Sequence, residues 1–482
     1  MKHGTQSPPS RRAQRGAALI IALVFFALIG VSTVLALARG RSDDAERERR
    51  THQALAEAKA ALIGFAAAMP FSVAEPEKRL GDLPCPDRDD DGVADPPCST
   101  VATRLGRLPW RTLGLADLRD GDGERLWYAV SVGFKNNPRT ACASPQDTGC
   151  INSDSTGSIT VRDPSNALVH DGRARVNGTA TEFNYSAAIA VVIGPGAVLT
   201  RQGGAAQARD DAASMSNPVN YLDTAFSEDN ANFVDHDDTN GFISGPIRSA
   251  SGDVILNDRI AILTYQDLVP LLEKRVVREV SSCLDQYATA NGGRYPWASD
   301  TSGNAFDNFA DKSGFRAGRV PDGLRPDPLA SPPFVPTASQ ALTDTRSDSN
   351  DTMVNAWPAA SCNLGYHNWR WWNEWKLHVF YSVADAYKPA PIPPDAAAVA
   401  PACGSCLGLS TPTGTVPEAR YFVAVGGRRL VSVNAGQPRS VAGDLANPAN
   451  FLEGENVFGA LTPDWFAIAA ATGSFNDVAG YR

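Results

Sequence analysis

The segment with the clearest potential for chemistry is an aspartate-rich loop in the polar part of the chain. Four of its aspartates occupy relative positions 1, 3, 5 and 9, namely Asp87, Asp89, Asp91 and Asp95. Gly92 stands at position 6, where the calcium loop of an EF-hand needs glycine for a sharp turn. Position 12 is Cys98 instead of glutamate, so the loop is closer to the short calcium loops of extracellular repeats. We predict a structural Ca²⁺ site here, with a solvated acidic turn as the alternative.

Eight cysteines form a second set of reactive residues. They are Cys85, Cys98, Cys142, Cys150, Cys283, Cys362, Cys403 and Cys406. An even count with several close pairs is typical of disulfides formed in an oxidising compartment. Cys85 and Cys98 bracket the aspartate loop and can be bridged around it. Buried free thiols or a zinc site are the alternatives, although the Cys-x2-Cys pair at 403–406 has no second pair to complete a zinc site.

The other polar residues form no catalytic pattern. None of the six histidines belongs to a His-Glu-x-x-His or a Cys/His signature, and the sequence has neither Gly-x-Ser-x-Gly nor a phosphate-binding loop. Two weaker acidic loops, residues 117–124 and 235–241, are interpreted as solvated turns, with cation binding as the alternative. We therefore expect that the protein is not an enzyme.

Composition describes a folded, acidic body. The 482 residues are 43% apolar and 20% charged, and the net charge is −9. Residues 1–16 contain four basic residues and no acidic one, so the rest of the chain has 40 basic and 53 acidic residues and a net charge of −13. A body of this charge does not favour nucleic acid as a partner but suits divalent cations.

An uncharged apolar run of 22 residues, 17–38, follows directly on Gly16 and a basic leader. This length is enough to span a bilayer as one helix, and the basic leader favours a cytoplasmic N-terminus. A secretory signal cleaved near residues 36–40 or a simple membrane anchor would also explain such a run.

Residues 11–21, RRAQRGAALII, resemble the class III signal of type IV prepilins and type II secretion pseudopilins. The resemblance implies that a prepilin peptidase cuts after Gly16 and that Ala17 becomes the methylated first residue. It also implies an inner-membrane protein with a single transmembrane helix at 17–39 and periplasmic heads. That helix would later pack against other pilins or pseudopilins in a fibre.

Ile21 departs from the usual pattern of this family. Most members have glutamate at mature position five, where it neutralises the amine of a neighbouring subunit in the apolar fibre core. Its absence is similar to K-type minor pseudopilins and PilX-like minor pilins. The resemblance therefore implies a minor subunit at the tip of a pilus or pseudopilus.

The remaining chain predicts an α+β fold with two related, loop-rich heads, each a helix packed on a small antiparallel sheet. The first head, 40–263, begins with an amphipathic helix at 41–69, and the second, 264–482, with a helix from Thr264 to Asn291. Segments such as Asn-Tyr-Leu-Asp at 220–223 and Asn-Phe-Leu-Glu at 450–453 recur in the same order in both heads, which indicates an internal duplication. Residues 298–360 are interpreted as a long loop, and the tryptophan-rich segment 369–375 as a core seam or a binding surface.

The function predicted from these features is assembly into, or capping of, a type IV pilus or type II secretion pseudopilus. The alternative is a membrane-anchored periplasmic or surface protein whose heads bind a ligand, as an adhesin or a substrate receptor.

Overall fold

A computed structural model describes twelve parts of the chain. They are residues 43–68, 79–135, 150–173, 184–202, 204, 206–210, 215–301, 309, 314–322, 370–389, 401–457 and 465–482. The predicted leader and transmembrane helix, with Gly16, Ala17 and Ile21, lie outside these residues, as do Cys142 and Cys362. Among the described helices, none combines the length and the apolar character that crossing a bilayer requires.

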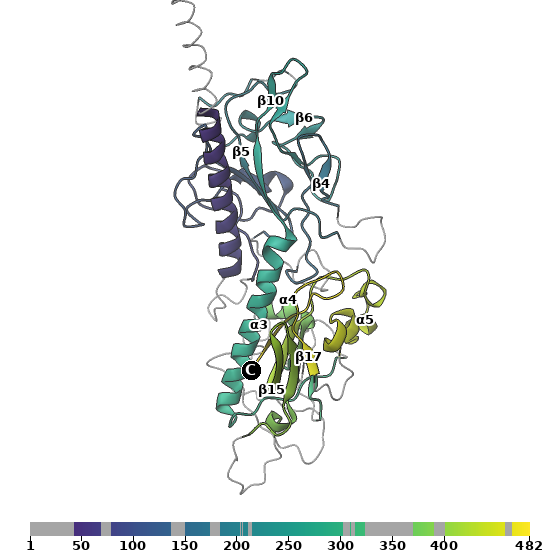
Figure 1. Ribbon diagram of the computed structural model, residues 1–482. Helices are drawn as coiled ribbons and strands as arrows, with labels where there is room; N and C mark the ends of the chain where they lie inside the picture. Colours follow the sequence, from purple (N-terminus) through teal and green to yellow (C-terminus); the bar gives the residue numbers. More distant parts are fainter. Residues whose placement is uncertain are drawn as a thin grey trace, which may run out of the picture.

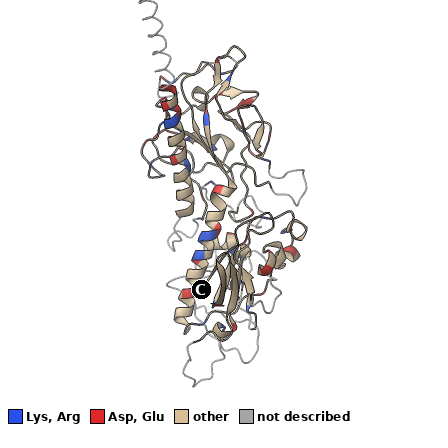
Figure 2. Ribbon diagram, in the orientation of Figure 1, with Lys and Arg blue, Asp and Glu red and all other residues tan. Residues whose placement is uncertain are grey.

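The fold is α+β, with two long helices and several small, mainly antiparallel sheets (Figure 1). The first long helix covers residues 43–68, within the predicted range 41–69. Its first turns are dense in charge (Figure 2), whereas Leu55, Ala58 and Leu62 on one face are almost fully buried. The expected amphipathic pattern is therefore present, because the apolar positions recur at helical spacing.

The first long helix packs on an antiparallel sheet of four strands in the order β1-β2-β5-β11. The strands are β1 (Leu105–Arg107), β2 (Trp127–Val130), β5 (Ala190–Gly194) and β11 (Arg259–Leu263). Thr51 lies over Gly194, where an added Cβ would come within 3.0 Å of the threonine methyl group. An ion pair between Glu48 and Arg259, 2.7 Å long, joins the helix to the edge strand. These elements belong to the first half of the chain, residues 43–263.

The second half, residues 264–482, contains another helix and another sheet of four antiparallel strands. The helix is α3 (Tyr265–Ala290), and Thr264 and Asp267 form a capping box at its start. The strands, in sheet order, are β12 (Ala317–Arg319), β13 (Val379–Val383), β16 (Tyr421–Val425) and β18 (Val478–Tyr481). Val277 of α3 packs against Gly480, so this helix also lies on its sheet (Figure 1).

The interpretation of residues 298–360 as one long loop is wrong at β12. Residues 317–319 form an edge strand that pairs with β13, with Arg319 opposite Phe380. The strand escapes sequence analysis because three residues, Ala-Gly-Arg, are too few to show an alternating pattern.

Smaller elements surround the two main sheets. The shorter strands are β3 (Val161–Arg162), β4 (Leu168–His170), β6 (Thr224–Ala225), β7 (Glu228–Asp229), β8 (Phe242–Ile243), β9 (Ile247–Arg248), β10 (Val254–Leu256), β14 (Leu407–Thr411), β15 (Gly414–Ala419) and β17 (Trp465–Ala467). They form sheets in the orders β4-β3-β8, β6-β7, β10-β9 and β15-β14-β17. Two short helices, α4 (Arg370–Trp375) and α5 (Ala442–Ala446), lie in the second half.

The two main sheets share details beyond strand order. Arg107, at the end of β1, lies over the ring of Trp127 at 4.3 Å, and Arg319, at the end of β12, lies over Phe380 at 4.0 Å. Tyr128 donates a hydrogen bond to the carbonyl of Pro84, and Tyr381 donates one to the carbonyl of Pro296. Each pair occupies the same place in its sheet, because Arg107 stands opposite Trp127 and Arg319 opposite Phe380.

Candidate metal site

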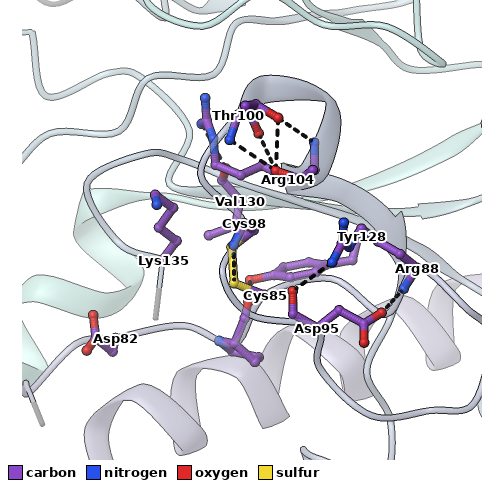
Figure 3. The surroundings of a disulfide bond; sticks show 12 residues. Asp82, Cys85, Arg88, Asp95, Cys98, Thr100, Arg104, Tyr128, Val130 and Lys135 are labelled. Carbon is purple, nitrogen blue, oxygen red and sulfur yellow. Dashed lines mark hydrogen bonds between the residues drawn. A yellow bond between two sulfur atoms is a disulfide. The ribbon is translucent and has the colours of Figure 1, made fainter. Parts of the chain in front are cut away.

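A disulfide between Cys85 and Cys98 closes the aspartate loop, as the sequence suggested (Figure 3). Both residues are buried, and the Cys98 amide donates a hydrogen bond to the Cys85 sulfur at 3.2 Å. A second bridge joins Cys403 and Cys406. Cys150 and Cys283 are also disulfide-bonded. The Cys85–Cys98 bridge holds the two ends of the acidic loop together.

Three of the four predicted metal ligands converge. One carboxylate oxygen from each of Asp87, Asp89 and Asp95 can be chosen so that all three lie within 4.8 Å of one another. Asp91 is not part of this group, and its Oδ1 accepts a hydrogen bond from the Val93 amide at 2.7 Å. The loop therefore presents three converging carboxylates, where the sequence predicted four.

The turn that brings the carboxylates together depends on Gly92 and on Asp87. Gly92 has φ +89°, a backbone conformation that favours glycine, and a Cβ there would meet the Trp110 ring at 2.6 Å. The two carboxylate oxygens of Asp87 accept hydrogen bonds of 2.7 Å from the amides of Asp90 and Gly92. The Asp87 side chain thus organises the loop backbone as well as facing the candidate site.

Burial raises the pKa of Asp87, although the backbone hydrogen bonds from Gly92 and Asp90 oppose this effect. Asp87 is 1% exposed, and the neighbouring carboxylates of Asp90 and Asp89 add repulsion. A bound divalent cation would neutralise this repulsion, and hard carboxylate oxygens are the ligands that Ca²⁺ prefers.

Asp90, a further carboxylate of the loop, is already paired with arginine. Asp90 forms an ion pair with Arg125 at 2.8 Å and approaches Arg107 at 3.8 Å. Asp95 accepts a hydrogen bond from the Arg88 amide at 2.6 Å, which Figure 3 shows beside the disulfide. These contacts take Asp90 away from the triad and leave Asp87, Asp89 and Asp95 as the carboxylates that can hold an ion.

The two other acidic loops use their carboxylates for structure. Asp120 is 5% exposed and accepts hydrogen bonds from the amides of Asp122, Glu124 and Gly196, so the prediction of a solvated turn is wrong for this residue. In the loop at 235–241, Asp235 pairs with Arg104 at 2.6 Å. The turn at 117–124 is closed by a buried carboxylate because three backbone amides compensate the burial.

Sequence analysis missed two pairs of buried carboxyl groups, Asp223 with Asp258 and Glu453 with Asp477. The backbone amide of Asp223 donates to Asp258 at 2.8 Å, and that of Glu453 donates to Asp477 at 3.0 Å. Burial and the adjacent carboxyl group raise the pKa of both Asp258 and Asp477. The recurring Asn-aromatic-Leu-acid segments could have revealed these pairs, because each segment ends on one member of a pair.

Three tryptophans of the segment 369–375 belong to the core. Trp371, Trp372 and Trp375 on α4 are at most 1% exposed. For these three residues the structure shows a core seam and not a binding surface, because their rings have almost no surface available to a ligand.

Comparisons with protein-family models, with curated proteins and with solved structures found no match for this chain.

Proposed function

We propose that this protein is a minor subunit of a type IV pilus or a type II secretion pseudopilus. The observation that carries the proposal is a long helix on a four-stranded antiparallel sheet, placed directly after an apolar segment with a prepilin-like leader. The helix over residues 43–68 has a charged beginning and an apolar face on the sheet, as expected where a fibre helix enters a periplasmic head. The chemistry of such a subunit is packing, without bond making beyond its own maturation.

We further propose that the two halves are duplicated heads. The support is a set of equivalent contacts around the two sheets. The Nε of Arg209 donates to the Asn220 carbonyl at 2.9 Å, and the Nε of Arg439 donates to the Asn450 carbonyl at 2.7 Å. Such coincident side-chain roles are difficult to explain by two unrelated folds.

The maturation step is tested by determining the mature N-terminus by mass spectrometry, with and without Gly16→Ala. We expect a methylated Ala17 in the wild-type protein and an unprocessed leader in the variant. A wild-type protein that keeps Met1, or one that begins near residue 40, would rule out the prepilin assignment.

Calcium at Asp87, Asp89 and Asp95 would have a structural role in this subunit. The three aspartates lie between the two bridged cysteines, and Asp87 pairs with Arg107 of the edge strand, so an ion would stabilise the loop against the edge of the first sheet. Disulfides form in the same oxidising compartment in which the heads of a pseudopilin are located.

The alternative, a membrane-anchored receptor or adhesin, has less support. Three tryptophans of the aromatic segment that could have formed a binding surface, Trp371, Trp372 and Trp375, are buried. Binding by a fibre tip remains compatible with assembly, and localisation of the tagged protein at fibre ends would separate a tip subunit from an anchored receptor.

A further inference from the structure

The two halves meet at a buried ion pair between residues far apart in the sequence. Asp154, in the first half, lies 2.8 Å from the guanidinium of Arg439, in the second half, and both side chains are 0% exposed. Arg429 approaches the other carboxylate oxygen at 3.6 Å, and the hydroxyl of Tyr185 lies 3.3 Å from Asp154. Burial raises the pKa of Asp154, but the two arginines outweigh that effect and keep the pKa below its usual value.

Arg439 and Arg209 perform the same task inside their own halves. Besides their Nε bonds to backbone carbonyls, each donates a second bond to a glycine carbonyl at the end of a central strand. Arg209 bonds Gly196 at 2.8 Å, and Arg439 bonds Gly427 at 3.1 Å. Both guanidinium groups are buried by this arrangement, and a buried cation needs a carboxylate nearby.

The carboxylate comes from different places in the two halves. Arg209 pairs with Glu124 of its own half at 3.1 Å. The pairing of Arg107 with Trp127 and of Arg319 with Phe380 places Leu377 of the second half where the first half has Glu124. Leucine carries no charge, and Asp154 of the first half is the carboxylate that pairs with Arg439.

A second ion pair joins the halves in the opposite sense, with the carboxylate from the second half and the arginine from the first. Glu374 of the second half lies 3.5 Å from Arg79 of the first half, and these side chains are 1% and 0% exposed. Glu374 also accepts a hydrogen bond from the Ile151 amide at 2.9 Å, in the same loop as Asp154. Tyr265, at the start of α3, donates to the Ser153 carbonyl at 2.9 Å and adds a neutral contact to this loop. Each half therefore gives one carboxylate to a buried arginine of the other. Arg79 also pairs with Asp82, and Glu374 with Arg370, inside their own halves.

We propose that this reciprocal exchange, Asp154 to Arg439 and Glu374 to Arg79, is an orientation lock that joins the two halves into one rigid body. A buried ion pair adds little net stability over an apolar contact, but another docking of the halves would leave Asp154 and Arg439 buried without each other. The lock also makes the second half dependent on the first, since the carboxylate described beside Arg439 comes from Asp154. This inference does not depend on the pilin assignment.

The test uses the full chain and amide hydrogen exchange followed by mass spectrometry. Asp154→Asn keeps the size of the side chain but removes its charge. We expect exchange in residues 427–439 to accelerate by about 100-fold, as removal of one partner from a buried pair predicts, while β2 and β5 of the first half keep their protection. Glu374→Gln should accelerate exchange in residues 79–83 and 150–155, through the other pair.

Two controls make the result specific. Asp253→Asn removes an exposed carboxylate from a hairpin of the first half and should change neither region. Glu124→Gln removes the carboxylate of Arg209 and should accelerate exchange near residues 196–209, within the first half alone. The proposal is overturned if Asp154→Asn exchanges like the wild-type protein in residues 427–439. It is equally overturned if Asp154→Asn loosens β2 and β5 as much as the second half, since Asp154 would then be a general stabilising residue of the first half.

Discussion

Glu273 on α3 makes the stability of this protein depend on pH in a direction that can be calculated. Its side chain is 3% exposed, and its Oε1 lies 3.3 Å from the Tyr265 hydroxyl oxygen. Burial raises its pKa from 4.5 to about 8, although hydrogen bonds with Ser153 and Tyr265 partly oppose the effect. The folded protein therefore holds a proton on Glu273 at neutral pH.

The direction of this pH dependence follows from the number of protons that Glu273 binds in the native and in the unfolded state. Between pH 4.5 and 8 the native state binds more protons at this residue than the unfolded state, so the free energy of unfolding falls as the pH rises. The stability that proton binding by Glu273 contributes is fully present below pH 4.5 and is lost as the pH passes through about 8. At about 1.4 kcal/mol for each pKa unit, the loss amounts to at most about 5 kcal/mol.

Glu273→Gln tests this reasoning because glutamine resembles the protonated carboxyl group. We expect the variant to match the wild-type protein near pH 5 and to be more stable than the wild-type protein by several kcal/mol above pH 8. Urea unfolding monitored by tryptophan fluorescence at pH 5, 6.5 and 8.5 measures the difference. Glu57→Gln, an exposed substitution on the first long helix, is the matched control. The argument is refuted if the free energies of unfolding of Glu273→Gln and of the wild-type protein change with pH in parallel.

Three other outcomes follow from the described contacts. Asp89→Ala should remove one binding event from a calorimetric titration with Ca²⁺, and an unchanged isotherm would exclude the site. Replacing Cys85 and Cys98 together by serine should weaken Ca²⁺ binding and lower the free energy of unfolding, measured in urea, by about 2–4 kcal/mol. If the variant keeps both its stability and its Ca²⁺ affinity, the bridge does not support the loop. Asp258→Asn should be more stable than the wild-type protein by a margin that grows from pH 5 to pH 8, because burial and the neighbouring Asp223 carboxylate raise the pKa of Asp258. A margin that shrinks as the pH rises, measured by urea unfolding, would contradict this.

The sequence alone determined the features that depend on neighbouring residues. The first long helix was predictable because residues 43–63 contain neither glycine nor proline and their apolar positions recur at helical spacing. The start of α3 was predictable from Thr264 and Asp267, which form a local capping box. The disulfide between Cys85 and Cys98 was predictable from short separation in an oxidising context.

Tertiary structure decided the features that depend on residues far apart in the chain. Which aspartates converge was decided by the fold of the loop, in which Gly92 lies against Trp110 and Asp91 accepts a hydrogen bond from the Val93 amide instead of joining the group. The burial of Trp371 and its neighbours depends on the sheet that covers them, and three residues of β12 carry too little pattern to reveal that strand. The contact of Asp154 with Arg439 joins residues 285 positions apart. No periodicity or local motif encodes such a contact, because the energy of a buried charge depends on what the rest of the fold places beside it.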